Sequence, residues 1–483
     1  MYMLGNISNN VNMKVKFLGV FIIVVYYLSL GIFAVIYPKF LSLVIIAAVI
    51  SGVVWIGYLA LGLKYWEILF LLLWASGLIF RFRGVRDIEI QVIDVWAFYR
   101  IILVVLVGLV LIGIALRISV LRTMFCSPLR YFFLLAMWQI VSVLWSVFPA
   151  WSLYRAVEYM INVFLMTVIT VKLKDFNFWR RFLNFVWIIV LILLVNIWFQ
   201  SLVFPEKALE HTKGIIGFRI GSFVPHIGGN GSGELGALIT LIGFARIING
   251  SKKISNFLLV ILGIITVIFS ESRSPFLGLV IGVLLILFVN RKINIKSLVF
   301  ISCGILFLMG PFWDMFSAWF LRGQPKNVFY SLTGRLDYWQ ATLELITSKN
   351  KLFTGFGAYT CRFYTFKYLG AEVSHLHNAY IEIFAGSGII GLLLFVLGVL
   401  YTFYFVIFKL RSKFYTILNN NDRMVTSEMV GAFGLWSVRS IFSSSIFIWH
   451  PAVLYLTIIS FVTFLNYTYF PSQSLSTSKK CVS

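Results

Sequence analysis

The feature that most constrains this chain is a series of long apolar runs. Runs of roughly 16 to 25 residues, long enough for a helix to cross a bilayer, recur along nearly the whole chain. Because lipid offers no hydrogen bonds to an exposed backbone, each run has to satisfy its own backbone groups as a helix. The chain is therefore predicted to be an all-α protein, a polytopic transmembrane helical bundle.

Composition excludes an ordinary soluble domain. Of the 483 residues, 60% are hydrophobic and only 12% are charged. A membrane β-barrel would instead show alternating segments of roughly 10 residues. Stretches such as VWIIVLILLVNIWF have no such alternation.

We expect about 12 to 14 membrane spans. The candidate segments are 17–37, 40–63, 66–80, 101–116, 131–147, 155–171, 182–204, 233–248, 255–270, 275–290, 297–314, 388–408, 428–446 and 450–467. The region 81–100 does not fit easily, because helix counting places it outside although it carries four arginines. A re-entrant or interfacial segment among the first four candidates would lower the number of spans.

Basic residues determine the expected orientation. The chain has 40 Lys and Arg against 17 Asp and Glu, a net charge of +23. Most of these cations lie in alternate short connections, which are cytoplasmic by the positive-inside rule, so the expected partner is the lipid bilayer and not nucleic acid. The basic clusters are Arg117/Arg122/Arg130, Lys172/Lys174/Arg180/Arg181, Lys252/Lys253, Arg291/Lys292/Lys296, Lys409/Arg411/Lys413 and Lys479/Lys480.

This orientation predicts the organisation of the chain. Residues 1–314 form N-terminal membrane helices with a short outer loop at 205–232, and 315–378 form a long outer loop. Residues 379–470 form the C-terminal helices, and 471–483 form a cytoplasmic tail.

Several arginines break the positive-inside trend because they fall on the outer side. They are Arg155, Arg219, Arg273 and Arg335. An arginine at a membrane edge needs an anionic partner or a route for its side chain to the lipid headgroups. The planar guanidinium binds phosphate in bidentate fashion, so this set favours a phosphate or diphosphate ligand. At Arg273, the turn SESRSP starts a helix whose free N–H groups suit an anion.

Two histidines precede the apolar run from 379 in the sequence SHLHNAYIEIF. One interpretation is a polar helix start, with Asn378 as the cap. A metal site lacks a recognisable third ligand, so no metal is expected. A neutral imidazole of His375 or His377 also suits a general base that removes a proton from a sugar hydroxyl. His377 is the preferred base because it lies closer to the helix start.

Five ordered motifs carry a family resemblance. They are SVLWSVFPAWSLYRA, RIGSFVPHIGGNGSGELGAL, FSESRSPFLGL, LTGRLDYWQATLELITSKNKLFTGFGAY and HLHNAYIEIFAGSGIIGLL. Together they resemble the membrane glycan transferases that comprise O-antigen ligases, O-antigen polymerases and related exopolysaccharide polymerases.

The resemblance implies a GT-C-like helical fold and an inverting, metal-independent enzyme without a cofactor. A glycan on undecaprenyl diphosphate would be transferred to a hydroxyl of an acceptor glycan at the periplasmic face of the bacterial inner membrane. Arg219 and Arg273 match arginines that hold the diphosphate, Arg335 matches the arginine of GR-x-x-x-W, and the two histidines match the proposed base. The supporting residues are Arg155, Asn378 and Trp339.

Three functions remain open. A polymerase that joins lipid-linked repeat units is preferred, with a chain-length regulator as a further partner. The second is a ligase that transfers the finished polymer to lipid A core. The third, a transporter or flippase for lipid-linked sugar, would predict inverted repeats with interrupted helices, and the sequence shows none.

Overall fold

A computed structural model describes residues 64–78, 84–90, 94–115, 118–212, 216–251, 253–292, 319, 321, 334–371, 373–444 and 449–469. The predicted spans 17–37, 40–63 and 297–314, much of the long outer loop and the tail lie outside these residues. The chain divides into two compact units, Met1–Leu72 and Leu73–Ser483. Of the first unit only residues 64–72 are described, and they begin helix α3 (Tyr65–Ser76).

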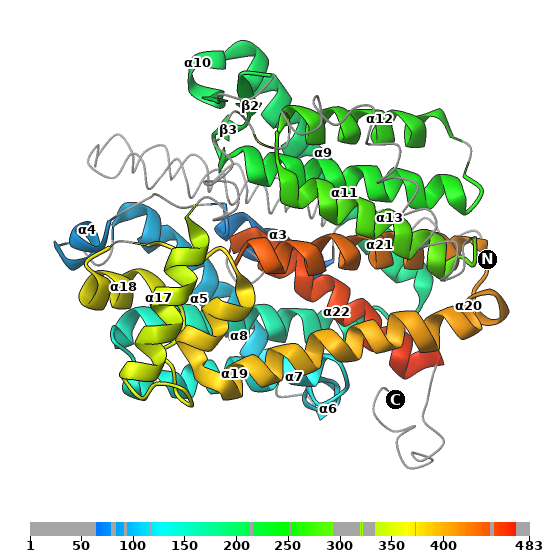
Figure 1. Ribbon diagram of the computed structural model, residues 1–483. Coiled ribbons are helices and arrows are strands. Elements are labelled where there is room, and N and C mark those ends of the chain that lie inside the picture. The colour runs from blue at the N-terminus through cyan, green and yellow to red at the C-terminus, as the bar shows by residue number, and fades with distance from the viewer. Residues whose placement is uncertain are drawn as a thin grey trace, which may run out of the picture. The chain divides into compact units, whose positions relative to one another are not determined.

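The predicted all-α helical bundle is confirmed (Figure 1). The helices of its first half are α4 (Val85–Ile90), α5 (Val95–Ala115), α6 (Ile118–Met124), α7 (Leu129–Val141), the 3-10 turn η2 (Ser142–Trp145), α8 (Pro149–Lys172), α9 (Phe176–Val203) and α10 (Pro205–Ala208). Those of its second half are α11 (Gly229–Ile248), α12 (Ile254–Phe269), α13 (Arg273–Val289), α17 (Arg335–Ser348), α18 (Cys361–Leu369), α19 (Ala379–Tyr404), the π-helical η3 (Phe405–Leu410), α20 (Arg411–Ile417), α21 (Asn420–Phe442) and α22 (Trp449–Tyr469).

Five of the described helices are long and apolar enough to cross a membrane. They are Pro149–Lys172, Phe176–Val203, Gly229–Ile248, Ala379–Phe414 and Pro451–Tyr469. Shorter apolar helices accompany them at Tyr65–Ser76, Arg100–Ile114, Leu129–Trp145, Ile254–Phe269 and Arg273–Val289. The protein is therefore a multi-pass membrane protein. Helices α19 and α21 begin before the predicted segments 388–408 and 428–446, at Ala379 and Asn420. The first residues of α21 are polar, and this helix is not among the five.

Small residues let the helices approach closely. A Cβ atom on Gly263 of α12 would lie 2.5 Å from the Gly236 carbonyl oxygen of α11. A Cβ atom on Gly282 of α13 would lie 2.8 Å from the Gly431 carbonyl oxygen of α21. Close helix packing through glycine is typical of membrane bundles. It joins α11, α12, α13 and α21 into one group, while α7 packs against α8 and α19.

The segment before α11 contains two short β-hairpins that the prediction of an outer loop at 205–232 did not include. Strand β1 (Leu209–His211) pairs antiparallel with β2 (Phe218–Ile220), so Glu210 faces Arg219. Strand β3 (Ser222–Phe223) pairs with β4 (His226–Ile227). We call the end of the bundle that carries these hairpins, α17 and α18 the loop end, on the left of Figure 1.

Residues 84–90, within the region 81–100 that is anomalous in the sequence, also lie at the loop end. Val85 and Ile88 of α4 are buried against Phe363 of α18, which belongs to the predicted outer loop. This packing places α4 beside a segment of the predicted outer loop.

Part of the long outer loop is built into the bundle. Backbone hydrogen bonds of 2.8 to 2.9 Å join residues 352–357 to residues 385–389 of α19. Gly388 bends α19 there with a φ of 66°, and a Cβ atom at this position would collide with the Phe353 backbone. The kink in α19 therefore forms the surface on which the loop docks.

Candidate functional site

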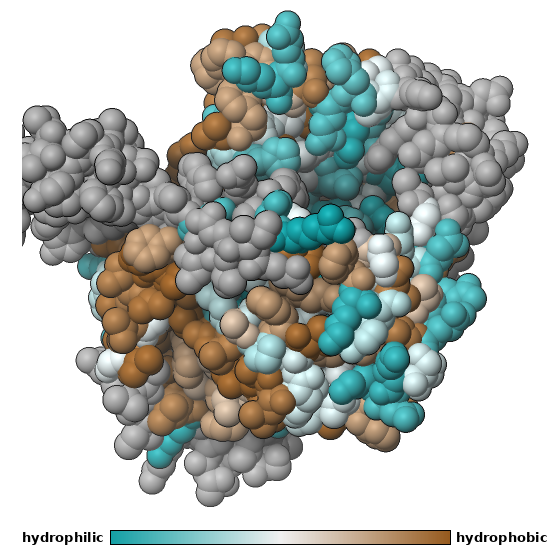
Figure 2. Space-filling model, turned by 90° about the vertical axis from the view of Figure 1, so that its left-hand side faces the viewer, coloured by the Kyte–Doolittle hydropathy of each residue, from teal (hydrophilic) through white to brown (hydrophobic). Residues whose placement is uncertain are grey.

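The loop end gathers cations from elements that are far apart in the sequence. Arg219 lies on β2, Arg273 is the first residue of α13, and Arg335 is the first residue of α17. The positive charges of Arg219 and Arg335 act on Arg273, so these side chains lie within electrostatic reach of one another. Figure 2 looks onto this end, and hydrophilic residues gather in its upper centre beside apolar surface. The arginines predicted to hold an anion therefore meet in the fold.

Arg219 is held by several partners. Its Nε donates to the Ser270 carbonyl oxygen at 2.8 Å, and its Nη1 pairs with Glu210 at 3.0 Å. Its Nη2 donates to the Asn230 side chain at 2.9 Å. Burial lowers the pKa of Arg219 in spite of the carboxylates of Glu210 and Glu271. The guanidinium is therefore placed rigidly where it has lost part of its hydration.

The turn before α13 is ordered as the sequence predicted. Ser272 is the N-cap but makes no side-chain cap hydrogen bond, and its Oγ donates instead to Asn230 at 2.7 Å. The Ser272 side chain therefore does not cap the positive N-terminal end of α13. This helix end can attract an anion. Arg273 itself donates from Nη2 to the Leu321 carbonyl oxygen at 3.1 Å.

Arg335 reaches the site from the start of α17. The preceding Gly334 has a φ of 78°, a left-handed conformation that favours glycine. Nη1 of Arg335 donates to the Phe442 carbonyl oxygen at the end of α21, at 3.1 Å. Burial and then repulsion from Arg439 lower the pKa of Arg335. An anionic ligand would relieve both effects.

Sequence reasoning missed Arg439. It lies near the end of α21, where its charge acts on Arg335, and it is buried with an exposed side-chain fraction of only 5%. Its Nε pairs with Glu234 of α11 at 2.8 Å, and its Nη1 donates to the Ser274 hydroxyl at 2.7 Å. An arginine near the outer end of a predicted span was the available signal, since such residues are rare in lipid.

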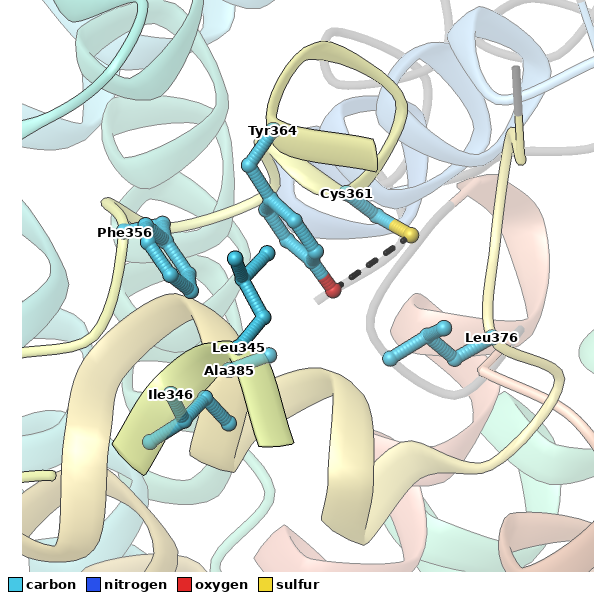
Figure 3. Close-up of a cluster of buried hydrophobic side chains, with 7 residues drawn as sticks. All are labelled: Leu345, Ile346, Phe356, Cys361, Tyr364, Leu376 and Ala385. Atoms are coloured by element: carbon cyan, nitrogen blue, oxygen red, sulfur yellow. Dashed lines mark hydrogen bonds between the residues drawn. The ribbon is translucent and has the colours of Figure 1, made fainter. Parts of the chain in front are cut away.

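The segment from His375 to Asn378 is anchored by the residue between the histidines. Leu376 is 1% exposed and packs in a cluster with Leu345, Ile346, Phe356, Cys361, Tyr364 and Ala385 (Figure 3). Its carbonyl oxygen accepts from Trp339 Nε1 and its N–H donates to Glu382 Oε2, both at 2.7 Å. Trp339, predicted as a supporting residue, therefore holds the histidine segment by a side-chain hydrogen bond to the backbone of Leu376.

The two histidines have different surroundings. Nδ1 of His375 lies 3.9 Å from Glu382 Oε1 in a half-buried position. His377 reaches the surface with a left-handed φ of 53°. Desolvation by the surrounding protein, followed by repulsion from Arg335, His375 and Arg439, lowers the pKa of His377 to about 4. Asn378 caps α19 as predicted, since Oδ1 accepts from the N–H groups of residues 380 and 381. His377 therefore lies within electrostatic reach of Arg335 and Arg439 and is neutral at neutral pH.

Arg155 has a different partner. Its Nη1 pairs with Glu158 on the same helix at 2.7 Å, and Glu158 also accepts from Arg100 Nε of α5 at 2.9 Å. The Arg155 guanidinium also lies 5.2 Å from the centre of the Trp151 ring. Arg155 thus shares the single carboxylate of Glu158 with Arg100 inside the bundle.

One comparison with known proteins is informative. A family model described as O-antigen ligase matches residues 258–396. This range includes Arg273, Arg335 and both histidines, while Arg219 and Arg439 lie outside it. No curated protein matches the chain. In the described residues, no three His, Cys, Asp or Glu side chains form a group that could hold a metal ion.

Proposed function

We propose that this chain, a member of the O-antigen ligase and polymerase superfamily, transfers a glycan from undecaprenyl diphosphate to a hydroxyl of an acceptor glycan. The family match supports glycan transfer of this general type by a membrane enzyme. The observation that carries the finer proposal is the convergence of Arg219, Arg273 and Arg335 beside the exposed imidazole of His377. The reaction takes place at the periplasmic face of the bacterial inner membrane.

The residues suit an inverting displacement. His377 accepts the proton of the acceptor hydroxyl while the oxygen forms a bond to the anomeric carbon of the donor sugar. The bond from that carbon to the phosphate oxygen breaks, and undecaprenyl diphosphate leaves with its electron pair. Arginines that are already in place stabilise the charge that develops on this leaving group, because they need no reorganisation during the reaction.

Three guanidiniums take the part that a divalent cation has in many enzymes that act on diphosphates. The proposed transfer therefore needs no metal. Purified protein in lipid nanodiscs should remain active in EDTA. Loss of turnover that Zn²⁺ restores would contradict this part of the proposal.

The preferred activity is that of a polymerase. With lipid-linked repeat units alone, the purified protein should produce a ladder of longer lipid-linked glycans on a gel. A product that forms only when lipid A core is added would identify a ligase instead. Movement of lipid-linked sugar across a liposome membrane without any new glycosidic bond would identify a transporter.

A charge-conserving substitution tests the diphosphate role of the arginines. Arg273→Lys should lower turnover at least tenfold, since an ammonium group cannot reproduce a bidentate contact worth roughly 1.5–3 kcal/mol. The matched control is Arg130→Lys, an exposed arginine in a predicted cytoplasmic cluster, which should be nearly neutral. Equal effects at equal protein levels would contradict a phosphate-specific role of Arg273.

A further inference from the structure

Helices α11 and α21 are antiparallel neighbours, and a buried ion pair joins them at each end. At the loop end, Glu234 of α11 accepts from Arg439 Nε at 2.8 Å and from Trp436 Nε1 at 3.0 Å. Both charged side chains are 5% exposed. Taken alone, this ion pair would only hold the two helices together.

At the opposite end Glu and Arg exchange helices, and the Trp comes from a third helix, α9. Glu428 of α21 accepts from Arg246 Nε at 2.6 Å and from Trp187 Nε1 at 2.7 Å. A further nitrogen of Arg246 donates to the Asn184 side chain at 2.8 Å. The chain therefore contains two Arg–Glu–Trp groups of the same side-chain types, and the Arg246 side chain is 20% exposed against 5% for Arg439.

Arg439 stands among other cations. Its Nη1 donates to the hydroxyl of Ser274, the residue after Arg273, and its positive charge acts on Arg219 and Arg335. Like charges in a partly desolvated place destabilise one another unless an anion joins them. Glu234 offsets the charge of Arg439, and Glu210 and Glu271 offset part of the charge of Arg219 and Arg273. Among the described residues only Arg439, together with burial, acts on the pKa of Arg335, so the four arginines still exceed the three carboxylates and favour an anion.

The hydrogen bonds of Arg439 also leave one guanidinium nitrogen for a ligand. Nε and Nη1 are occupied by Glu234 and Ser274. No described residue accepts a hydrogen bond from Nη2 in this structure. From these contacts we infer that Arg439 is a fourth phosphate-binding cation of the diphosphate site, with Glu234 as its counter-ion. This inference rests on the proposed function, since it takes the diphosphate of the donor as the ligand.

The experiment measures binding of undecaprenyl diphosphate to the full-length protein in nanodiscs. Arg439→Gln should weaken binding roughly tenfold or more, as expected for the loss of a hydrogen bond to a charged group. Arg246→Gln breaks the matched pair at the opposite end and should leave binding unchanged. Thermal unfolding of both variants should show a similar loss of stability.

The variant Glu234→Gln tests whether Arg439 binds the ligand or only holds α11 and α21 together. It breaks the same ion pair as Arg439→Gln, but it leaves the cation in place and removes a negative charge from the site. We therefore expect undecaprenyl diphosphate to bind as tightly as to the unmodified protein, or more tightly. If Glu234→Gln and Arg439→Gln weaken binding equally, Arg439 only joins helices and the inference is wrong.

A further variant distinguishes this inference from the proposed function. If Arg273→Gln weakens binding and Arg439→Gln does not, the inference fails while the proposed function stands. If both variants bind normally, both fail. Should Arg439→Gln not fold, Arg439→Lys keeps a charge beside Glu234 but removes Nη2, the nitrogen that we infer contacts the phosphate, so unchanged binding by Arg439→Lys would overturn the inference.

Discussion

At the scale of single residues, the backbone of His377 is unusual. A left-handed φ of 53° is uncommon outside glycine and costs of the order of 1 kcal/mol. The neighbours on both sides impose it, because Leu376 is held through its N–H and carbonyl oxygen and Asn378 caps α19. This strained turn directs His377 towards Arg335 and Arg439, which act on its charge.

Substitution of the two histidines tests which one is the base. His377→Ala should lower turnover by roughly 10²–10⁴-fold, the usual contribution of a general base, while donor binding is largely kept. His375→Ala should have a smaller effect, because its imidazole lies beside Glu382. Product formation and undecaprenyl diphosphate binding are measured at matched folding. If His375→Ala is inactive and His377→Ala is active, the base is His375 and the assignment is reversed.

The pKa of His377 predicts an unusual pH profile. A base acts only when unprotonated, so a pKa of about 4 keeps kcat/KM nearly constant above about pH 5 and lowers it as the pH falls towards 4. An imidazole with an ordinary pKa near 6.5 would already lose activity below pH 7.

Arg335→Gln removes a cation that lowers this pKa, so the acidic limb should move to higher pH. The pH–rate profiles of the unmodified protein and of Arg335→Gln are measured. The pH at which each rate falls to half of its own maximum is then compared. An unmoved limb would show that His377 is not the titrating base.

At the scale of elements, the kink of α19 joins this apolar helix to the predicted outer loop. Trp138 Nε1 of α7 donates to the Ser387 carbonyl oxygen at 2.7 Å, next to the bend at Gly388. Trp145 Nε1 of η2 donates to the Thr354 carbonyl oxygen at 2.7 Å. The bend therefore joins α7, η2, the loop and α19.

Gly388→Ala should disrupt this assembly. The φ of 66° disfavours an L-residue, and the new methyl group would collide with the Phe353 backbone. We expect a loss of several kcal/mol in stability, as for strained and overpacked sites, together with loss of transfer. The control is Gly113→Ala, where no atom lies within 4 Å of the added methyl group. Equal thermal stability of the two variants would contradict this role of the kink.

At the scale of the whole molecule, charge is divided between the two ends of the bundle. The loop end carries the arginine cluster with its carboxylates, and the opposite end carries Arg246 and basic turns such as Arg291 and Arg411, whose side chains donate to carbonyl oxygens. The positive-inside rule assigns the basic turns to the cytoplasm. The diphosphate site is therefore expected on the periplasmic side.

Cysteine labelling tests this orientation. In a protein whose native cysteines are replaced, Ser348→Cys at the exposed end of α17 should react with a membrane-impermeant thiol reagent in cells with a permeable outer membrane. Ser412→Cys, exposed on α20, should react only after the inner membrane is lysed. The reverse pattern would overturn the orientation and the periplasmic site.

Local patterns determined much of this protein. Hydropathy along the chain predicts the helices, since a span depends only on neighbouring residues, and the motifs single out Arg219, Arg273 and Arg335. Only the tertiary structure decided which charges meet. Arg439 pairs with Glu234, 205 positions away in the sequence, and Arg100 pairs with Glu158, 58 positions away. Ion pairs form between side chains that folding brings together, so local sequence carries no record of their partners.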